Sequence, residues 1–152
     1  MTTIAAIRPD DWNLPLLLHV AGAMVLVGAL AVVTASLVSA RGGDAAALTR
    51  LSFRTLLYAA LPGFILTRVS AEWIASEEDV DDEATWIGIG YMVSDFGLLL
   101  LIVGTVLIGV AMRRLRRDEG PPGRAAGVAT ALISLTLAGY LVAIWAMTTK
   151  PD

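Results

Sequence analysis

The stretch AALPGFILTRVSAEW, residues Ala59–Trp73, decides the fold that we predict for this chain. It belongs to an apolar segment of membrane-spanning length, yet it carries Arg68 and Glu72 one helical turn apart. A charged side chain inside a bilayer costs roughly 2.5–3.5 kcal/mol even on the scale derived from membrane insertion. Other polar groups must therefore receive Arg68, and the other acid within an apolar segment is Asp95. We predict a membrane bundle that closes around these side chains.

The composition places the chain among polytopic membrane proteins. Of its 152 residues 57% are hydrophobic, whereas soluble domains have about 45–50% apolar residues. The excess lies in four long runs, which predict transmembrane helices over about 14–39, 55–75, 85–112 and 125–148. The predicted fold class is thus all-α, an integral membrane four-helix bundle that forms one domain over residues 1–152. Because the chain contains no cysteine, disulfides, thiol catalysis and thiolate metal sites are excluded.

The loop charges predict the orientation of this bundle. The termini and the acidic loop at 76–83 hold only Arg8 and Lys150, whereas the other two loops hold eight basic residues: Arg41, Arg50, Arg54, Arg113, Arg114, Arg116, Arg117 and Arg124. The positive-inside rule therefore places both termini outside and both arginine-rich loops in the cytoplasm. Tryptophans at the predicted outer end of each span agree with this orientation, as an interfacial belt should: Trp12, Trp73, Trp86 and Trp145.

Two local features are expected in the second helix. Residues 45–54 have the pattern of an amphipathic lead-in that continues into the span over 55–75. Pro62 lacks the backbone N–H that would bond to the carbonyl of Tyr58, so we expect a kink there.

Polar residues from all four predicted helices share the outer half of the bundle, and we predict that they form a ligand-binding cluster: His19, Arg68, Glu72, Asp95 and Tyr140. The spacing of Gly88, Tyr91 and Asp95 puts them on one face of the third helix. One arginine against two acids leaves a spare carboxylate, which can take a proton or a cation. The alternative is a structural network in which Arg68 bridges the two acids and fixes the helix register.

Small residues repeat every seven positions along two of the helices. One series is Gly90, Gly97, Gly104 and Ala111, and the other is Gly22, Ala29 and Ser36. Such stripes let another backbone approach closely. The partner of the first stripe is either the helix at 14–39 or a second copy of the protein, and we expect a homodimer or a partner membrane protein to bind through these glycine-rich faces.

Two other functions stay open. The first is a membrane redox protein that binds haem or a metal ion through His19; the chain has no second histidine, so a dimer, a tyrosine or a methionine would supply the other ligand. The second is a structural or accessory subunit of a larger membrane complex. No phosphate-binding loop, nucleophile elbow, zinc motif or nucleic-acid signature is present. The sequence therefore identifies no catalytic residue, and the metal ligands remain unknown.

Three short segments carry a family resemblance. LLHVAGAMVLVGAL (17–30), ALPGFIL (60–66) and AIWAMTTKP (143–151) together resemble small four-span bacterial membrane proteins of unknown function. Those proteins are remotely similar to the membrane domain of copper-resistance D proteins, whose first helix also carries a histidine and glycines. The resemblance implies a multi-pass protein of the bacterial plasma (inner) membrane. The related protoporphyrinogen oxidases use an intramembrane lysine, which this chain lacks in all four predicted spans.

Overall fold

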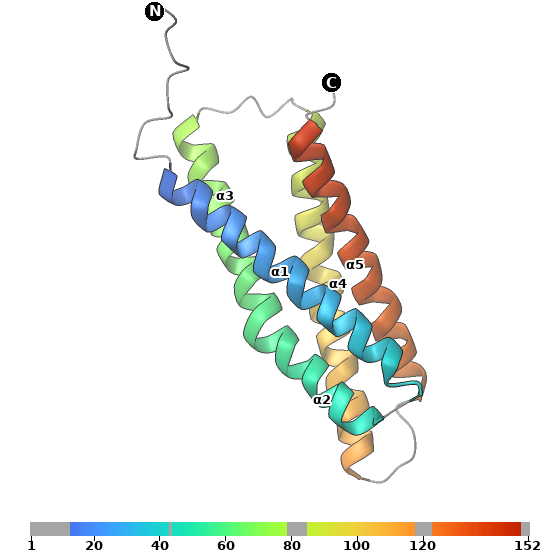
Figure 1. Ribbon diagram of the computed structural model, residues 1–152. Helices are drawn as coiled ribbons and strands as arrows, with labels where there is room; N and C mark the ends of the chain where they lie inside the picture. The colour runs from blue at the N-terminus through green and yellow to red at the C-terminus, as the bar shows by residue number, and fades with distance from the viewer. Residues whose placement is uncertain (1–12, 43, 79–84, 118–122, 150–152) are drawn as a thin grey trace, which may run out of the picture.

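A computed structural model describes residues 13–42, 44–78, 85–117 and 123–149, and these form an all-α bundle of four helices (Figure 1). The second helix is continuous but has three parts, of which the middle one is π-helical. In chain order the elements are α1 (Asn13–Ser39), α2 (Ala45–Thr55), η2 (Leu56–Ala60), α3 (Leu61–Glu78), α4 (Thr85–Arg116) and α5 (Gly123–Thr149). Trp12, residues 79–83 of the acidic loop and residues 118–122 lie outside the described residues.

Three of these helices are long and apolar enough to cross a membrane: Leu14–Ser39, Thr85–Arg116 and Gly123–Thr149. This confirms the membrane class and three of the predicted spans. The predicted span over 55–75 corresponds to η2 and α3. It is not among the three, because α3 carries four charged residues: Arg68, Glu72, Glu77 and Glu78.

The second helix begins as the sequence predicts and departs from regular geometry before the proline. The Asp44 side chain accepts a hydrogen bond from the Ala47 N–H at 3.0 Å, and α2 continues directly into η2. At the end of η2 the Leu61 N–H donates to the Leu56 carbonyl, a π-helical bond. Because Pro62 cannot donate to the carbonyl of Tyr58, the structure has a π-helical turn immediately before it, where the sequence predicted a kink.

The helices pack as two antiparallel pairs, α1 with α3 and α4 with α5, while α1 also contacts α5. The first pair meets at Gly22 and Gly63. A Cβ on Gly22 would lie 2.7 Å from Thr67 Oγ1 and 3.1 Å from the Gly63 carbonyl oxygen, so only glycine fits there. In contrast, α3 and α4 diverge toward the end of the bundle where α3 ends and α4 begins (Figure 1).

The glycine stripe of α4 packs against α5 within the same chain. A Cβ on Gly90, Gly97 or Gly104 would come within 2.7, 3.1 and 2.7 Å of Met147, Tyr140 and Ile133, respectively. The residues that meet at this contact are therefore spaced seven positions apart on both α4 and α5. This stripe is covered by α5 and not by the helix at 14–39, because the spacing describes one helix and does not identify the helix that covers it. A homodimer or a partner protein that binds through the glycine-rich faces stays a prediction.

Several hydroxyl side chains buried in this core keep a hydrogen bond, whereas those of Thr34, Thr49 and Tyr140 have no partner among the described residues. The side chains of Ser52, Ser70, Thr105 and Thr136 each donate to the carbonyl four residues earlier, at 2.6–2.9 Å. Such bonds satisfy a hydroxyl within its own helix, which suits a helix in an environment without water.

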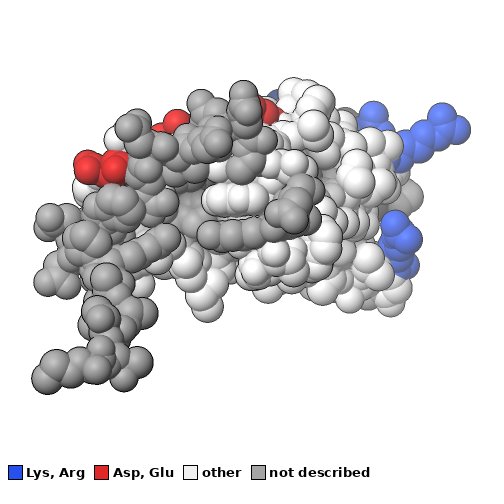
Figure 2. Space-filling view, turned by 90° about the horizontal axis from the view of Figure 1, so that it is seen from above, with Lys and Arg blue, Asp and Glu red and all other residues white. Residues whose placement is uncertain are grey.

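The described charges sort along the bundle. Viewed from above, the acidic side chains lie at the left and along the upper edge of the molecule, and most basic side chains lie at its right (Figure 2). Three tryptophans lie near the end of α3, the start of α4 and the end of α5: Trp73, Trp86 and Trp145. These helix ends lie at the same end of the bundle (Figure 1).

Candidate functional site

Arg68 bridges α3 and α4 through two ion pairs. Its Nη2 lies 3.0 Å from Glu72 Oε1 on the next turn of α3, and its Nη1 lies 3.4 Å from Asp95 Oδ1 on α4. The i, i+4 spacing brings Glu72 to Arg68 on the same helix face. Asp95 arrives from the neighbouring helix, at a place where α3 and α4 otherwise make few contacts. We call these three side chains the charge cluster.

Tyr91 completes the surroundings of the guanidinium. Arg68 Cζ lies 4.7 Å from the centroid of the Tyr91 ring, within range of a cation–π interaction. Tyr91 precedes Asp95 by one helical turn, so both residues present their side chains to Arg68. The sequence placed them on one face of the helix, but it did not identify Tyr91 as a residue of the site.

The charge cluster lies at the surface of the bundle. The side chain of Arg68 is 30% exposed, that of Glu72 52% and that of Asp95 69%. The expectation that the bundle closes around these charges was therefore wrong. The physical reason is the divergence of α3 and α4, which leaves both carboxylates accessible from the side while the arginine holds them together.

Tyr140 lies beside this cluster but deeper in the bundle. Its side chain packs over Gly97, where a Cβ would lie 3.1 Å from the hydroxyl oxygen, and the residue is only 8% exposed. The hydroxyl lies near Ser94 and within electrostatic range of Arg68 and Asp95. It nevertheless makes no hydrogen bond of good geometry to any described residue. A buried hydroxyl without a partner is rare and calls for an explanation, such as a bound water or ion.

His19 is held on the other face of α3. Its Nδ1 lies 3.0 Å from the Thr67 carbonyl oxygen. Since a carbonyl can only accept, Nδ1 carries the proton and donates, and Nε2 keeps its lone pair in the neutral ring. Among the described residues His19 makes no ion pair with a carboxylate. The structure therefore groups Arg68, Glu72, Asp95 and Tyr140, whereas His19 is hydrogen-bonded to Thr67, the residue that precedes Arg68.

No metal centre is formed by the part of the chain that the structure describes. No group of three or more His, Asp or Glu side chains there is close enough to hold a metal ion. A haem or metal ion bound by His19 would therefore need a ligand of another kind, one from outside the described residues, or one from another molecule.

Comparison of the chain with protein-family models, with curated proteins and with solved structures gives no match. The class of the protein therefore follows from its own structure. It is a helical, multi-pass membrane protein with a bundle of four helices, three of them apolar candidate spans, and with hydroxyl side chains buried among them.

Proposed function

We propose that the chain crosses the membrane four times, with the helix formed by η2 and α3 as its second span and with both termini outside. The close contact of α1 and α3 at Gly22 and Gly63 supports this, because it aligns α3 with an apolar span. The arginine-rich loops support the orientation. The sequence resemblance supports the bacterial plasma membrane.

We further propose that this membrane protein binds a small cation, a proton or a cationic ligand at the charge cluster. The single observation that carries this proposal is an unbalanced charge: two carboxylates, those of Glu72 and Asp95, share one guanidinium. A purely structural ion pair needs one acid for one arginine. The second carboxylate attracts a positive ligand, which would reach it from the end of the bundle where α3 and α4 diverge (Figure 1).

The Tyr140 hydroxyl distinguishes this function from a structural network. If the network is only structural, Tyr140→Phe removes a buried group that has no partner, and stability stays the same or rises. If the hydroxyl contributes to a bound cation through its oxygen, the same substitution weakens binding. Asp95→Asn removes one carboxylate and leaves the pair of Arg68 with Glu72.

Thermal unfolding in lipid nanodiscs tests the proposal. The melting temperature is measured in sodium or potassium chloride at constant ionic strength, with N-methylglucamine chloride as the replacement salt. A ligand that binds only the folded state raises the melting temperature with its concentration. We expect such a rise for the wild type with at least one cation, and a smaller rise at lower pH because protons compete for the carboxylates.

Variants assign this response to residues. We expect Asp95→Asn to abolish the rise and Tyr140→Phe to reduce it, whereas Glu77→Gln, an exposed acid of α3 outside the charge cluster, keeps it. A wild type without any response to cations or pH would contradict the proposal, and so would an Asp95→Asn variant that responds like the wild type. Either result would favour a structural or accessory subunit.

His19 supports a second candidate function, a haem- or metal-binding membrane redox protein. The hydrogen bond that the Nδ1–H donates to the Thr67 carbonyl oxygen fixes the ring and leaves the lone pair on Nε2. A metal-ligating histidine usually donates such a bond from the ring nitrogen that does not bind the metal. An absorbance spectrum of the purified protein, together with its metal content, tests this function. A Soret band or a stoichiometric metal that is lost in His19→Gln would support it, and the absence of both would contradict it.

A further inference from the structure

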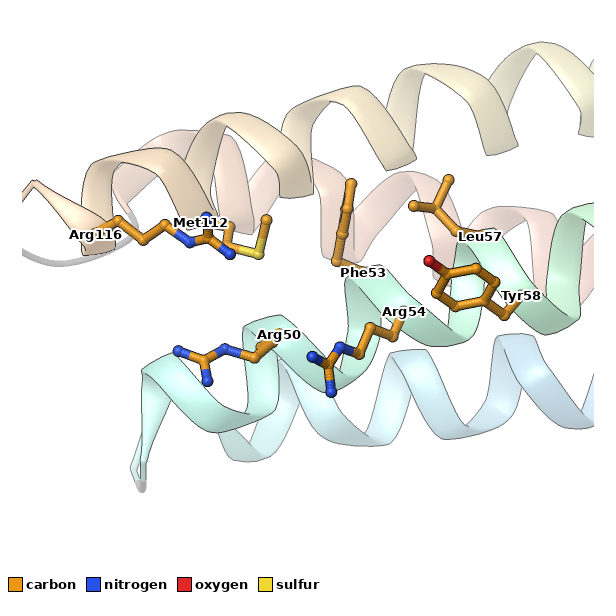
Figure 3. Close-up of a pocket in the computed structure, with 7 residues that line it drawn as sticks. All are labelled: Arg50, Phe53, Arg54, Leu57, Tyr58, Met112 and Arg116. Atoms are coloured by element: carbon orange, nitrogen blue, oxygen red, sulfur yellow. The ribbon is translucent and has the colours of Figure 1, made fainter.

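A second candidate site lies at the opposite end of the molecule, between α2 and α4. A cavity of about 140 Å³ opens there, bordered by residues of α2, η2 and α4 (Figure 3). At roughly 30 Å³ per water molecule, it has room for a phosphate group but not for a whole lipid. We call it the arginine pocket.

Three arginines line this pocket. Arg50 and Arg54 come from consecutive turns of α2, and Arg116 comes from the last turn of α4 (Figure 3). All three are exposed, and none forms an ion pair with a carboxylate among the described residues. Like charges at i, i+4 repel each other, and the third cation adds to this repulsion. An anion bound between them would relieve it, and guanidinium groups bind phosphate oxygens through paired N–H donors.

The remaining walls of the pocket are apolar. Phe53 and Leu57 are one helical turn apart, next to Arg50 and Arg54, and Met112 of α4 lies opposite them. The Phe53 ring packs on Gly109 of α4, where a Cβ would lie 3.3 Å away. A soluble phosphate gains nothing from such a surface, whereas the glycerol and acyl carbons of a phospholipid do.

The position of the pocket also favours a lipid. The row of Arg50 and Arg54 continues to Tyr58, which borders the same pocket and is 79% exposed. A tyrosine with an apolar ring and a polar hydroxyl suits the boundary between head groups and acyl chains. The arginines lie beyond it, toward the loops that join α1 to α2 and α4 to α5, at the level where lipid phosphates would be.

From the geometry we propose that the arginine pocket is a binding site for one anionic phospholipid, with the phosphate between the three guanidinium groups and the glycerol backbone against Phe53, Leu57 and Met112. The site is separate from the charge cluster and does not depend on its function. It would couple α2 to α4 through a lipid, at the end of the bundle away from Arg68.

Native mass spectrometry in detergent tests the site with three probes: phosphatidylglycerol, phosphatidylcholine and soluble glycerol phosphate. We expect phosphatidylglycerol to bind more tightly than the other two. Each basic residue near a membrane surface contributes roughly 1 kcal/mol to binding an anionic lipid, or about a fivefold change in affinity. The triple variant Arg50→Gln, Arg54→Gln, Arg116→Gln should therefore lose about a hundredfold in affinity for phosphatidylglycerol.

A control variant with the same loss of charge distinguishes a specific lipid site from general electrostatic attraction between the lipid and this end of the bundle. The triple variant Arg41→Gln, Arg114→Gln, Arg124→Gln removes the same charge from the same end of the bundle but from outside the pocket, and Arg114 is turned toward Gly123 of α5. We expect it to lose no more than about threefold in affinity, because screening weakens distant charges. Equal losses in both triple variants would overturn the proposal. Tight binding of glycerol phosphate, or equal binding of phosphatidylcholine, would also overturn it.

Single substitutions keep the test independent of the folding of α2. Arg116→Gln changes one exposed side chain at the end of α4 and should weaken phosphatidylglycerol binding about fivefold. Arg116→Lys keeps the charge but loses the paired donors, so its binding should fall between that of Arg116→Gln and the wild type. An Arg116→Gln variant that binds like the wild type would exclude Arg116 from the site.

Discussion

At the residue scale, the packing of the helices depends on the positions of glycines, which have no side chain. Gly22 lets α1 approach α3 so closely that a Cβ would lie 2.8 Å from the Thr67 backbone nitrogen. Gly28, two turns further along the same helix, has no atom within 4 Å of that position. The two glycines therefore form a matched pair, one at a helix contact and one in open space.

We predict that Gly22→Ala destabilises the protein by about 1–3 kcal/mol, the usual effect of overpacking a tight contact. Gly28→Ala should have no destabilising effect, because its methyl group meets nothing and alanine favours a helix over glycine. Thermal unfolding of both variants in detergent, followed by circular dichroism, measures the difference. Equal melting temperatures would mean that α1 and α3 do not meet at Gly22.

The charge cluster shows which site residues a sequence can predict. The contact of Arg68 with Glu72 follows from their spacing on one helix, and that with Asp95 from the need to compensate a charge in an apolar environment. The positions of Tyr140 and His19 depend on how the helices turn toward each other, which no spacing within one helix describes. The exposure of the acids depends on the divergence of α3 and α4, so it too needed the structure.

At the scale of elements, α4 and α5 form an antiparallel pair in a fixed register. Gly90, Gly97 and Gly104 on α4 receive Met147, Tyr140 and Ile133 of α5 in reverse order. The sequence predicted both helices and the period of the glycines, because each is a property of a single helix. It did not predict the register, since an antiparallel partner is recognised only when the two helices are placed together.

We predict that a double-mutant cycle detects this register. Gly97→Ala should be destabilising on its own, and Tyr140→Leu should relieve the contact, with an interaction free energy of about 0.5–3 kcal/mol for the pair. Gly97→Ala combined with Met147→Leu, one repeat out of register, should be additive within about 0.5 kcal/mol. Coupling to Met147 without coupling to Tyr140 would indicate a register shifted by seven residues.

At the scale of the whole molecule, charge separates the two ends of the bundle. The sequence predicted the membrane class and four spans, of which the structure confirms three as apolar helices long enough to cross a membrane, because composition and length determine these features. The crossing of the second helix is less evident, because its charges lower its hydropathy below that of the other three helices. Whether it crosses determines if Gly42 and Glu77 lie on the same side of the membrane or on opposite sides.

We predict that these two positions lie on opposite sides. Because the natural chain has no cysteine, Glu77→Cys, Thr149→Cys and Gly42→Cys each introduce one thiol. In intact bacterial cells, a membrane-impermeant maleimide should label positions 77 and 149, whereas position 42 should react only after the membrane is permeabilised. Labelling of positions 42 and 77 from the same side would show that the second helix does not cross.

The π-helical turn over Leu56–Ala60 has a consequence for how this protein tolerates insertions and deletions. It accommodates one residue more than an α-helical turn, so it rotates α2 by about 100° relative to α3. Each half of the long helix can thus keep its own angular phase, with α3 facing α1 and Phe53 facing α4. Deletion of one residue there would restore an unbroken spiral, and it would swing the guanidinium groups of Arg50 and Arg54 around the helix axis, away from Arg116.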